Sequence, residues 1–174
     1  MSWIQTYTGR EVYPFELDLE DINIQDIAHS LALQCRFNGH SKMFYSVAEH
    51  CCRVSDICRD DLKGAGLLHD ASEAYLSDIP SPIKDLLPEY KKAEQRIEKL
   101  IEYRFGIREC KNEDKLHVKE CDLILLATEA RDLMSVCKTP WTSPLSPLPE
   151  KIIPWDWQVA EKEFLIRAEK LGLK

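Results

Sequence analysis

The sequence has 174 residues, of which 44% are hydrophobic and 30% are charged, and its formal net charge at neutral pH is -7. This length and composition favour one globular domain, spanning residues 1–174, with enough chain to bury a sizeable core. The acidic balance excludes a general binder of nucleic-acid polymers or of anionic membranes, since either would need a basic surface.

The cysteine pattern and the N-terminus both favour a cytoplasmic protein. The number of cysteines is seven, which is odd, and no two of them have C-x-x-C spacing, so neither a disulfide framework nor a zinc ribbon is indicated. Thiols kept reduced in a cytosol are the simplest account. The first residues lack the basic stretch and apolar run of a signal peptide, and no segment is apolar for long enough to cross a bilayer.

Helix signals are scarce in the first 20 residues. Residues 3–7 alternate and predict a short strand, which residues 8–10 would turn, and residues 15–19 are expected to be extended. From Asn23 onward, apolar residues recur at spacings of three and four, which predicts a helix that ends near Cys35.

Two further helices are predicted in the first half of the chain. Asn-Gly at residues 38–39 is a turn signal and places a loop over residues 36–40. Ser46 and Glu49 have capping-box spacing, which predicts a helix that ends around residues 59–60. The next helix begins at residues 61–63, and the segment 78–82, with two prolines, ends it.

The second half of the sequence predicts three more helices. An amphipathic helix opens at residues 88–89, with Gly106 at its C-terminal cap, and a long helix spans residues 113–134. Residues 135–155 hold five prolines and are expected to wrap irregularly before a last helix over residues 156–171. The sum is an all-α fold, a bundle of five to six helices with an irregular N-terminal segment. Phosphate-binding glycine loops and the G-x-S-x-G motif are absent.

The segment 68–73 is the centre of the predicted chemistry. If it is helical, His69, Asp70 and Glu73 project from neighbouring positions on one face, beside the apolar residues 64–68. A histidine and two carboxylates in such surroundings are costly unless something binds or pairs them, and a divalent metal suits both ligand types. Taken alone, the motif fits better with an ordinary histidine paired with an aspartate on a half-exposed helix, so the rest of the chain has to decide.

Two residues on other predicted helices complete a ligand set. His50 lies on the preceding helix, and Asp122 enters an apolar run on a later one. Separately, His50 fits a satisfied core histidine, and Asp122 fits a solvent-facing position. Together with His69 and Asp70 they make a mixed nitrogen–oxygen site with room for water, which is typical of a catalytic rather than a closed structural metal site.

His50, then His69-Asp70, then Asp122 resembles the ligand order of the HD-domain metal-dependent phosphohydrolases. Residues 69–73 followed by 78–84 are similar to the bacterial 5′-deoxynucleotidase branch, and residues 36–39 ahead of 46–50 fit the same branch. The resemblance covers roughly residues 24–134. It implies an HD-type bundle, a homodimer, and hydrolysis of deoxyribonucleoside or ribonucleoside 5′-monophosphates to nucleoside and phosphate.

The resemblance also assigns the metal ligands and the catalytic group. His50, His69, Asp70 and Asp122 are expected to hold one divalent ion, for which Co2+, Mn2+ and Mg2+ are the candidates. A bound ion can lower the pKa of a water towards about 7 and polarise a phosphoryl oxygen. Glu73 is expected to orient or deprotonate that water without being a ligand.

Substrate contacts are implied for three residues. Arg36 is placed on the substrate phosphate, for which a guanidinium offers a bidentate fork. Asp78 is placed near the sugar. Phe37 is assigned to the substrate as well, although the best-known members of the branch carry tryptophan there.

Neighbouring residues are interpreted as ordinary surface or structural groups. Glu129 and Arg131 are expected to form helix-surface or interface pairs, although Glu129 also fits a group that supports the site. A Cys51 nucleophile with His50 as base is rejected, because adjacent helical residues point about 100° apart. The remaining histidines are not obviously placed to add a second ion: His29, His40 and His117.

Two rival functions remain open at the sequence level. One is an HD hydrolase of another nucleotide, such as a nucleoside triphosphate or an alarmone. The absence of an obvious basic cluster for a longer phosphate chain favours the monophosphate. The other is a catalytically silent nucleotide-binding regulator, against which the carboxylate of Glu73 argues.

Overall fold

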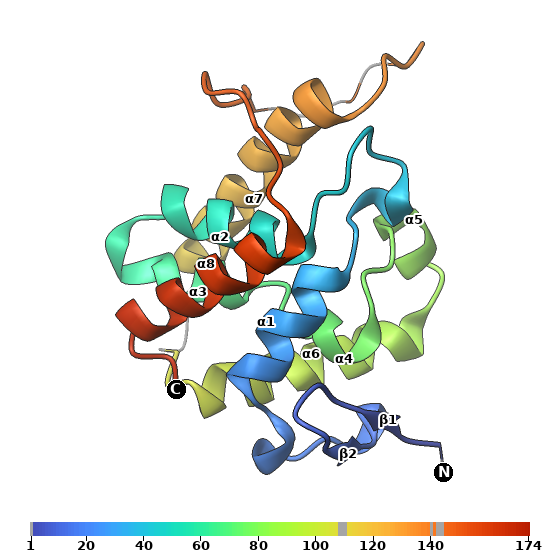
Figure 1. Cartoon of the computed structure of the whole chain (residues 1–174), viewed down its shortest axis with the longest axis vertical. Coiled ribbons are helices and arrows are strands. Elements are labelled where there is room, and N and C mark those ends of the chain that lie inside the picture. The colour runs from blue at the N-terminus through green and yellow to red at the C-terminus, as the bar shows by residue number, and fades with distance from the viewer. Residues whose placement is uncertain (1, 108–110, 140, 142–144) are drawn as a thin grey trace.

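The computed structural model describes residues 2–107, 111–139, 141 and 145–174, and helices dominate it (Figure 1). The predicted all-α class is confirmed. The sheet found in this part of the chain is one short antiparallel hairpin, in which β1 (Ile4–Gln5) pairs with β2 (Glu11–Val12). The strand and turn expected there are confirmed. Residues 15–19 are not one extended segment, because two short 3-10 helices (Pro14–Glu16 and Leu19–Asp21) occupy most of the region.

Three long helices form one side of the bundle. α1 (Ile24–Leu33), α2 (Val47–Ile57) and α8 (Trp157–Lys170) pack against one another, and Figure 1 shows α8 beside both of the others. The chain therefore returns at its C-terminal end to cover helices formed from its first third.

Side chains cap the first two of these helices. Asn23 accepts hydrogen bonds from backbone N–H groups in the first turn of α1, and the predicted cap Ser46 accepts one from the N–H of Glu49 at 3.0 Å. The carboxylate of Glu49 does not complete the expected capping box. It accepts instead from Arg53 and from the N–H of Trp155 at 2.8 Å, which ties the irregular C-terminal segment to α2.

The prediction that one continuous helix carries the central motif is wrong. The structure divides it into α3 (Lys63–Leu68), a turn over residues 69–72 and α4 (Glu73–Leu76). Backbone N–H groups in the turn bond the carbonyl three residues earlier, as Ala71 does to Leu68 and Glu73 to Asp70, both at 3.0 Å. The tighter repeat replaces the continuous helical face on which the motif was expected to lie.

One short helix was not predicted: α5 (Ser81–Lys84) is a single turn with proline at a tolerated first-turn position. The two helices after it follow the predicted order. α6 (Pro88–Arg104) ends before Gly106, whose φ of +61° confirms the expected cap, and α7 (Asn112–Leu133) is the long helix. The described parts of residues 135–155 hold no helix or strand, as expected; Cys110, Pro140 and Pro144 lie outside the described residues.

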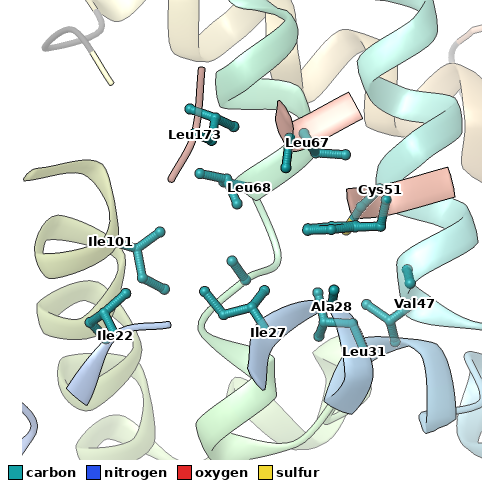
Figure 2. Packing of buried hydrophobic residues seen from close by; sticks show 14 of the residues in the cluster. Ile22, Ile27, Ala28, Leu31, Val47, Cys51, Leu67, Leu68, Ile101 and Leu173 are labelled. Carbon is teal, nitrogen blue, oxygen red and sulfur yellow. The ribbon is translucent and has the colours of Figure 1, made fainter. Parts of the chain in front are cut away.

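The main core lies where α1, α2, α3 and α6 meet, and Figure 2 shows Ile27, Leu67 and Ile101 in one buried cluster. A second cluster, which includes Val54 and Leu125, lies between α2 and α7. Each such side chain stabilises the fold by roughly 1.5–3 kcal/mol when fully buried. Helix α2 is thus fixed between two apolar clusters. Among the described helices, none is both long and apolar enough to span a membrane.

Candidate metal centre and active site

The four predicted metal ligands converge where α2, the turn after α3, and α7 meet. His50 Nε2 lies 3.2 Å from His69 Nε2, 3.5 Å from Asp70 Oδ2 and 3.3 Å from Asp122 Oδ1. His69 Nε2 lies 3.1 Å from the same Asp70 oxygen. Ligands about 2.1 Å from one ion stand roughly 3 Å from each other. Two imidazole nitrogens and two carboxylate oxygens at these separations fit a divalent ion.

Both histidines are oriented through their second ring nitrogen. His50 Nδ1 lies 2.7 Å from Glu129 Oε1, and His69 Nδ1 lies 2.8 Å from the backbone oxygen of Gly66. Because these oxygens only accept, each Nδ1 donates, which leaves each Nε2 facing the cluster and able to coordinate an ion once it carries no proton. A carboxylate or backbone carbonyl behind a metal-binding histidine is the usual outer partner. The outer partners of the two histidines, and not only the four proposed ligands, therefore suit a site for a divalent ion.

The predicted surface role of Glu129 is wrong. Its side chain is fully buried, and it binds His50 and also Arg36, whose Nη2 lies 3.2 Å from Glu129 Oε2. Burial would raise the pKa of Glu129, but Arg36 and His50 outweigh burial and hold that pKa below its usual value. Arg131, by contrast, pairs with its neighbour Asp132 at the surface.

The two ligand carboxylates are held in their ionised form. Burial would raise the pKa of each, but His69 outweighs it at Asp70, and His50 outweighs it at Asp122, so both pKa values fall well below the usual range. Arg36 adds to the effect at Asp70, since its Nη1 lies 3.6 Å from Asp70 Oδ2. Ionised carboxylates are the form that coordinates a cation.

Glu73 is a buried carboxylate with one unpaired oxygen. Its side chain is nearly inaccessible, and Oε1 lies 3.5 Å from Lys84 Nζ, whereas Oε2 finds no hydrogen-bond partner among the residues that the structure describes. Burial, followed by the charges of Asp70 and Asp78, raises the pKa of Glu73 to about 9. A buried carboxyl oxygen of this kind needs a hydrogen-bond partner, and a water molecule can serve as one.

Gln34 fixes the segment that carries Glu73 and Asp78, and sequence reasoning missed it. Its Nε2 donates to the backbone oxygen of Glu73 at 3.1 Å, and its Oε1 accepts from the N–H of Asp78 at 2.9 Å. Between them, Ser77 has φ +73° and ψ 151°, a conformation normally reserved for glycine. The hydroxyl of Tyr90 donates to the Ser77 carbonyl at 2.7 Å and helps to hold this strained residue.

The loop after α1 brings a second strained segment to the site. Phe37 and Asn38 have φ values of +57° and +53°, which non-glycine residues rarely adopt. The Arg36 guanidinium lies 5.3 Å from the centroid of the Phe37 ring, and Trp141 meets that ring edge-on at 5.9 Å. No local pattern predicts Trp141 at this position, because its contact with Phe37 joins segments about a hundred residues apart.

A cavity of about 330 Å³ lies beside the metal ligands, between α3, α6 and α7. His69, Asp70 and Asp122 line it together with Lys115 and Lys119 of α7. Arg36, Phe37 and Asp78 are not among the described residues that line this cavity. The structure thus brings Arg36 to Asp70 but does not place the expected substrate contacts in this opening.

Replacing Gly66 with alanine should disturb the site through the backbone. A Cβ there would lie 2.8 Å from Cys58 Sγ and 3.2 Å from the Cα of Ser55, so α3 must move. Overpacking costs about 1–3 kcal/mol, against a gain in helix propensity of roughly 1 kcal/mol. We expect a net loss of about 1 kcal/mol in urea unfolding and weaker metal binding, because the displaced carbonyl orients His69.

Gly64→Ala is the matched control on the same helix. Its Cβ would meet only the side-chain ends of Ile107 at 3.1 Å and Leu173 at 3.9 Å, which can shift. This variant should bind metal as the unmodified protein does. Equal metal affinity in both alanine variants would contradict a role for the Gly66 carbonyl.

Comparisons with known proteins show relatives whose names state no activity. No family model matches the chain. Over 133 residues it is 44% identical to the uncharacterized protein YfdR of Escherichia coli K12, a match that covers 76% of this chain and 73% of the relative. Over 116 residues it is 34% identical to the uncharacterized protein RCAP_rcc00048 of Rhodobacter capsulatus, which covers 61% of this chain and 59% of that relative.

Proposed function

Because the chain belongs to the family of the Escherichia coli protein YfdR, whose name states no activity, we propose its function from the site itself. We propose that the protein is an HD-type, metal-dependent phosphomonoesterase. It would hydrolyse nucleoside 5′-monophosphates, above all the deoxy forms, to nucleoside and phosphate. The cytoplasmic location and the homodimer stay predictions.

The observation that carries the proposal is the convergence of four metal-ligating atoms. His50, His69, Asp70 and Asp122 come from three separate elements. His50 Nε2 nevertheless lies 3.2–3.5 Å from a ligand atom of each of the other three, and His69 Nε2 lies 3.1 Å from Asp70 Oδ2. Each imidazole is oriented by an outer partner. A structural His–Asp pair on one helix has no need of this arrangement.

The residues around the ligands divide the chemical work of phosphate ester hydrolysis. His50, His69, Asp70 and Asp122 would hold a divalent ion, which would supply positive charge for a phosphoryl oxygen and lower the pKa of a bound water. Glu73 Oε2 is the acceptor proposed for the proton of the attacking water. Lys84 opposes the rise in the pKa of Glu73, and a divalent ion beside Asp70 would oppose it further and favour the carboxylate that a base must be. Arg36 Nε is buried without a partner among the described residues, so it can donate to a phosphate oxygen.

The nucleoside is proposed to lie beyond Arg36. Phe37 and Trp141 offer aromatic surface at the loop, of the kind on which bases stack. Asp78, held by Gln34 and partly buried, is the proposed acceptor for a sugar hydroxyl. Phe37, Trp141 and Asp78 are therefore the residues proposed to select the base and the sugar of the substrate.

Phosphate release is the direct test. The purified protein, loaded with Mn2+ or Co2+, is incubated with a panel of ribo- and deoxyribonucleoside mono-, di- and triphosphates. We expect inorganic phosphate from deoxyribonucleoside monophosphates, and loss of that activity in Asp70→Ala, which removes a ligand. Tight nucleotide binding by the metal-loaded protein without any product would contradict the proposal and favour a silent regulator.

Two lysines support a second candidate, hydrolysis of a nucleoside triphosphate or an alarmone. Lys115 and Lys119 line the cavity next to Asp122, and Lys119 Nζ lies 2.7 Å from Asp122 Oδ2. They provide positive charge for a longer phosphate chain, which the sequence did not make evident. Release of triphosphate or pyrophosphate, rather than of phosphate, would select this candidate in the same panel.

A further inference from the structure

A second cluster of metal-ligating atoms lies outside the four-residue site. Cys58, His117 and Cys121 offer two thiols and an imidazole whose ligand atoms all lie within 4.8 Å of one another. Cys121 Sγ is 3.7 Å from His117 Nε2. Both cysteines are buried, with 4% and 3% of their surface exposed, and both are free thiols.

The cluster forms because α2 ends against α7. His117 and Cys121 are four residues apart on α7 and therefore share a face of that helix. Cys58 is the C-terminal cap residue of α2. The apolar cluster that includes Val54 and Leu125 packs the two helices together and brings the thiol of Cys58 to this face.

The distance between Cys121 Sγ and His117 Nε2 is close to that expected for two ligands of one tetrahedral ion. An ion about 2.3 Å from sulfur and about 2.0–2.1 Å from nitrogen holds these two atoms roughly 3.5 Å apart. The measured 3.7 Å between Cys121 Sγ and His117 Nε2 differs from that by a few tenths of an ångström. Rotation about side-chain bonds can supply such a change without moving either helix.

We propose that Cys58, His117 and Cys121 bind a soft divalent ion of the Zn2+ type, with water in the fourth position. Thiolate ligands select soft ions, whereas imidazole and carboxylate ligands also suit harder ones. The proposed site, with two sulfurs and one nitrogen, therefore differs in preference from the centre formed by His50, His69, Asp70 and Asp122. It stands independently of the hydrolase activity proposed above.

Coordination has to replace existing hydrogen bonds. The backbone N–H of Arg59 donates to His117 Nε2 at 3.2 Å, and the thiol of Cys121 donates to the carbonyl of Ile57 at 3.7 Å. This hydrogen bond lies at the surface, so water can take the place of the imidazole as partner of the Arg59 backbone N–H when an ion binds His117. Each coordinating cysteine releases its proton to solvent as the metal–sulfur bond forms.

The position of this cluster connects it to the first centre. Cys58 Sγ lies against Gly66, whose carbonyl orients His69, and Cys121 immediately precedes Asp122. An ion bound here would fasten the end of α2 to α7, the two helices that carry His50 and Asp122. Zn2+ should therefore raise the melting temperature of the protein, since it binds the folded chain.

Cobalt absorption tests the proposal, because thiolate ligands give Co2+ an intense near-ultraviolet charge-transfer band that imidazole and carboxylate ligands do not. The full chain is stripped with chelator under reducing conditions and titrated with Co2+. We expect this band, and its displacement by Zn2+. Three substitutions should each lower the affinity for the Co2+ that gives this band by more than roughly 100-fold: Cys58→Ser, Cys121→Ser and His117→Ala. Direct ligands should matter at least as much as outer partners, whose loss costs about 10- to 100-fold.

Three control variants separate this site from its neighbours. Cys137→Ser, at an exposed cysteine outside the cluster, should leave the band unchanged, and His50→Ala should keep it. Cys51 lies near His69 and Asp70, so loss of the band in Cys51→Ser would place the thiolate at the first centre and overturn the proposal. A reduced unmodified protein without the band, or a folded Cys121→Ser that retains it, would overturn the proposal as well; circular dichroism establishes folding.

Discussion

Replacing Glu129 with alanine should weaken binding of a divalent ion by about 10- to 100-fold and lower the free energy of unfolding by about 3–5 kcal/mol. Glu129 is fully buried and binds His50 Nδ1 at 2.7 Å and Arg36 Nη2 at 3.2 Å. Without it, His50 loses the acceptor that orients its ring. The guanidinium of Arg36 loses a buried partner, and a buried charge without its partner is costly.

Calorimetric metal titration and urea unfolding of the metal-free protein measure these two effects separately. Glu161→Ala is the matched control, because Glu161 also pairs with a histidine, His29 at 3.2 Å, but lies outside the site. It should leave metal affinity unchanged. Glu129→Gln keeps an acceptor for His50 but loses the charge, so it should retain more metal affinity than Glu129→Ala. Unchanged metal binding in Glu129→Ala would show that His50 needs no outer partner.

The long helices were predictable because their signals are local. Residues 113–134 were expected to be helical and α7 spans Asn112–Leu133; residues 156–171 were expected and α8 spans Trp157–Lys170. Apolar periodicity and caps set such elements without reference to distant parts of the chain. The break between α3 and α4 left no such signal. Residues 69–72 are compatible with a helix, and the tighter turn shows only in the backbone hydrogen bonds.

The convergence of the four proposed metal ligands was predictable for a different reason. Histidines and aspartates beside apolar residues are costly unless bound or paired, and the order of His50, His69-Asp70 and Asp122 resembles that of the HD-domain phosphohydrolases. The groups that support these residues carried no comparable signal in the sequence. Glu129 follows His50 by 79 residues, and its sequence position on α7 resembled an ordinary surface site.

Supporting groups that act through backbone atoms are harder still to find in a sequence. Gly66 contributes a carbonyl, which every residue has, and only its place beneath His69 makes it part of the site. Gln34 acts because its amide reaches both Glu73 and Asp78, across 39 and 44 residues. Relations of this kind depend on tertiary distance, which residue spacing does not encode.

Replacing Glu73 with glutamine should lower turnover of the proposed phosphomonoesterase by roughly 10²–10⁴-fold, the usual contribution of a general base. Metal affinity should stay near that of the unmodified protein, because Glu73 is not one of the four ligands. Glutamine has nearly the same size but cannot accept the water's proton. Steady-state phosphate release measures kcat, and metal titration of the same preparation shows that the ion still binds.

The same substitution should stabilise the metal-free protein above the ordinary pKa of a glutamate. With the pKa of Glu73 raised to about 9, the unfolded chain releases this proton first, so stability falls as pH rises from that ordinary value towards 9. Glutamine removes this loss, and urea unfolding at several pH values should show the variant gaining relative to the unmodified protein as pH rises.

Glu94→Gln is the matched control for Glu73→Gln. Glu94 is the other carboxylate paired with Lys84, yet it lies on α6 and contacts none of the four ligands. It should retain most of the turnover, so an equal loss in both variants would assign the effect to Lys84 rather than to a base. A variant that is slow, binds metal normally and gains stability at high pH shows that the fold holds Glu73 at a cost in stability, as expected of a carboxylate buried for catalysis rather than for folding.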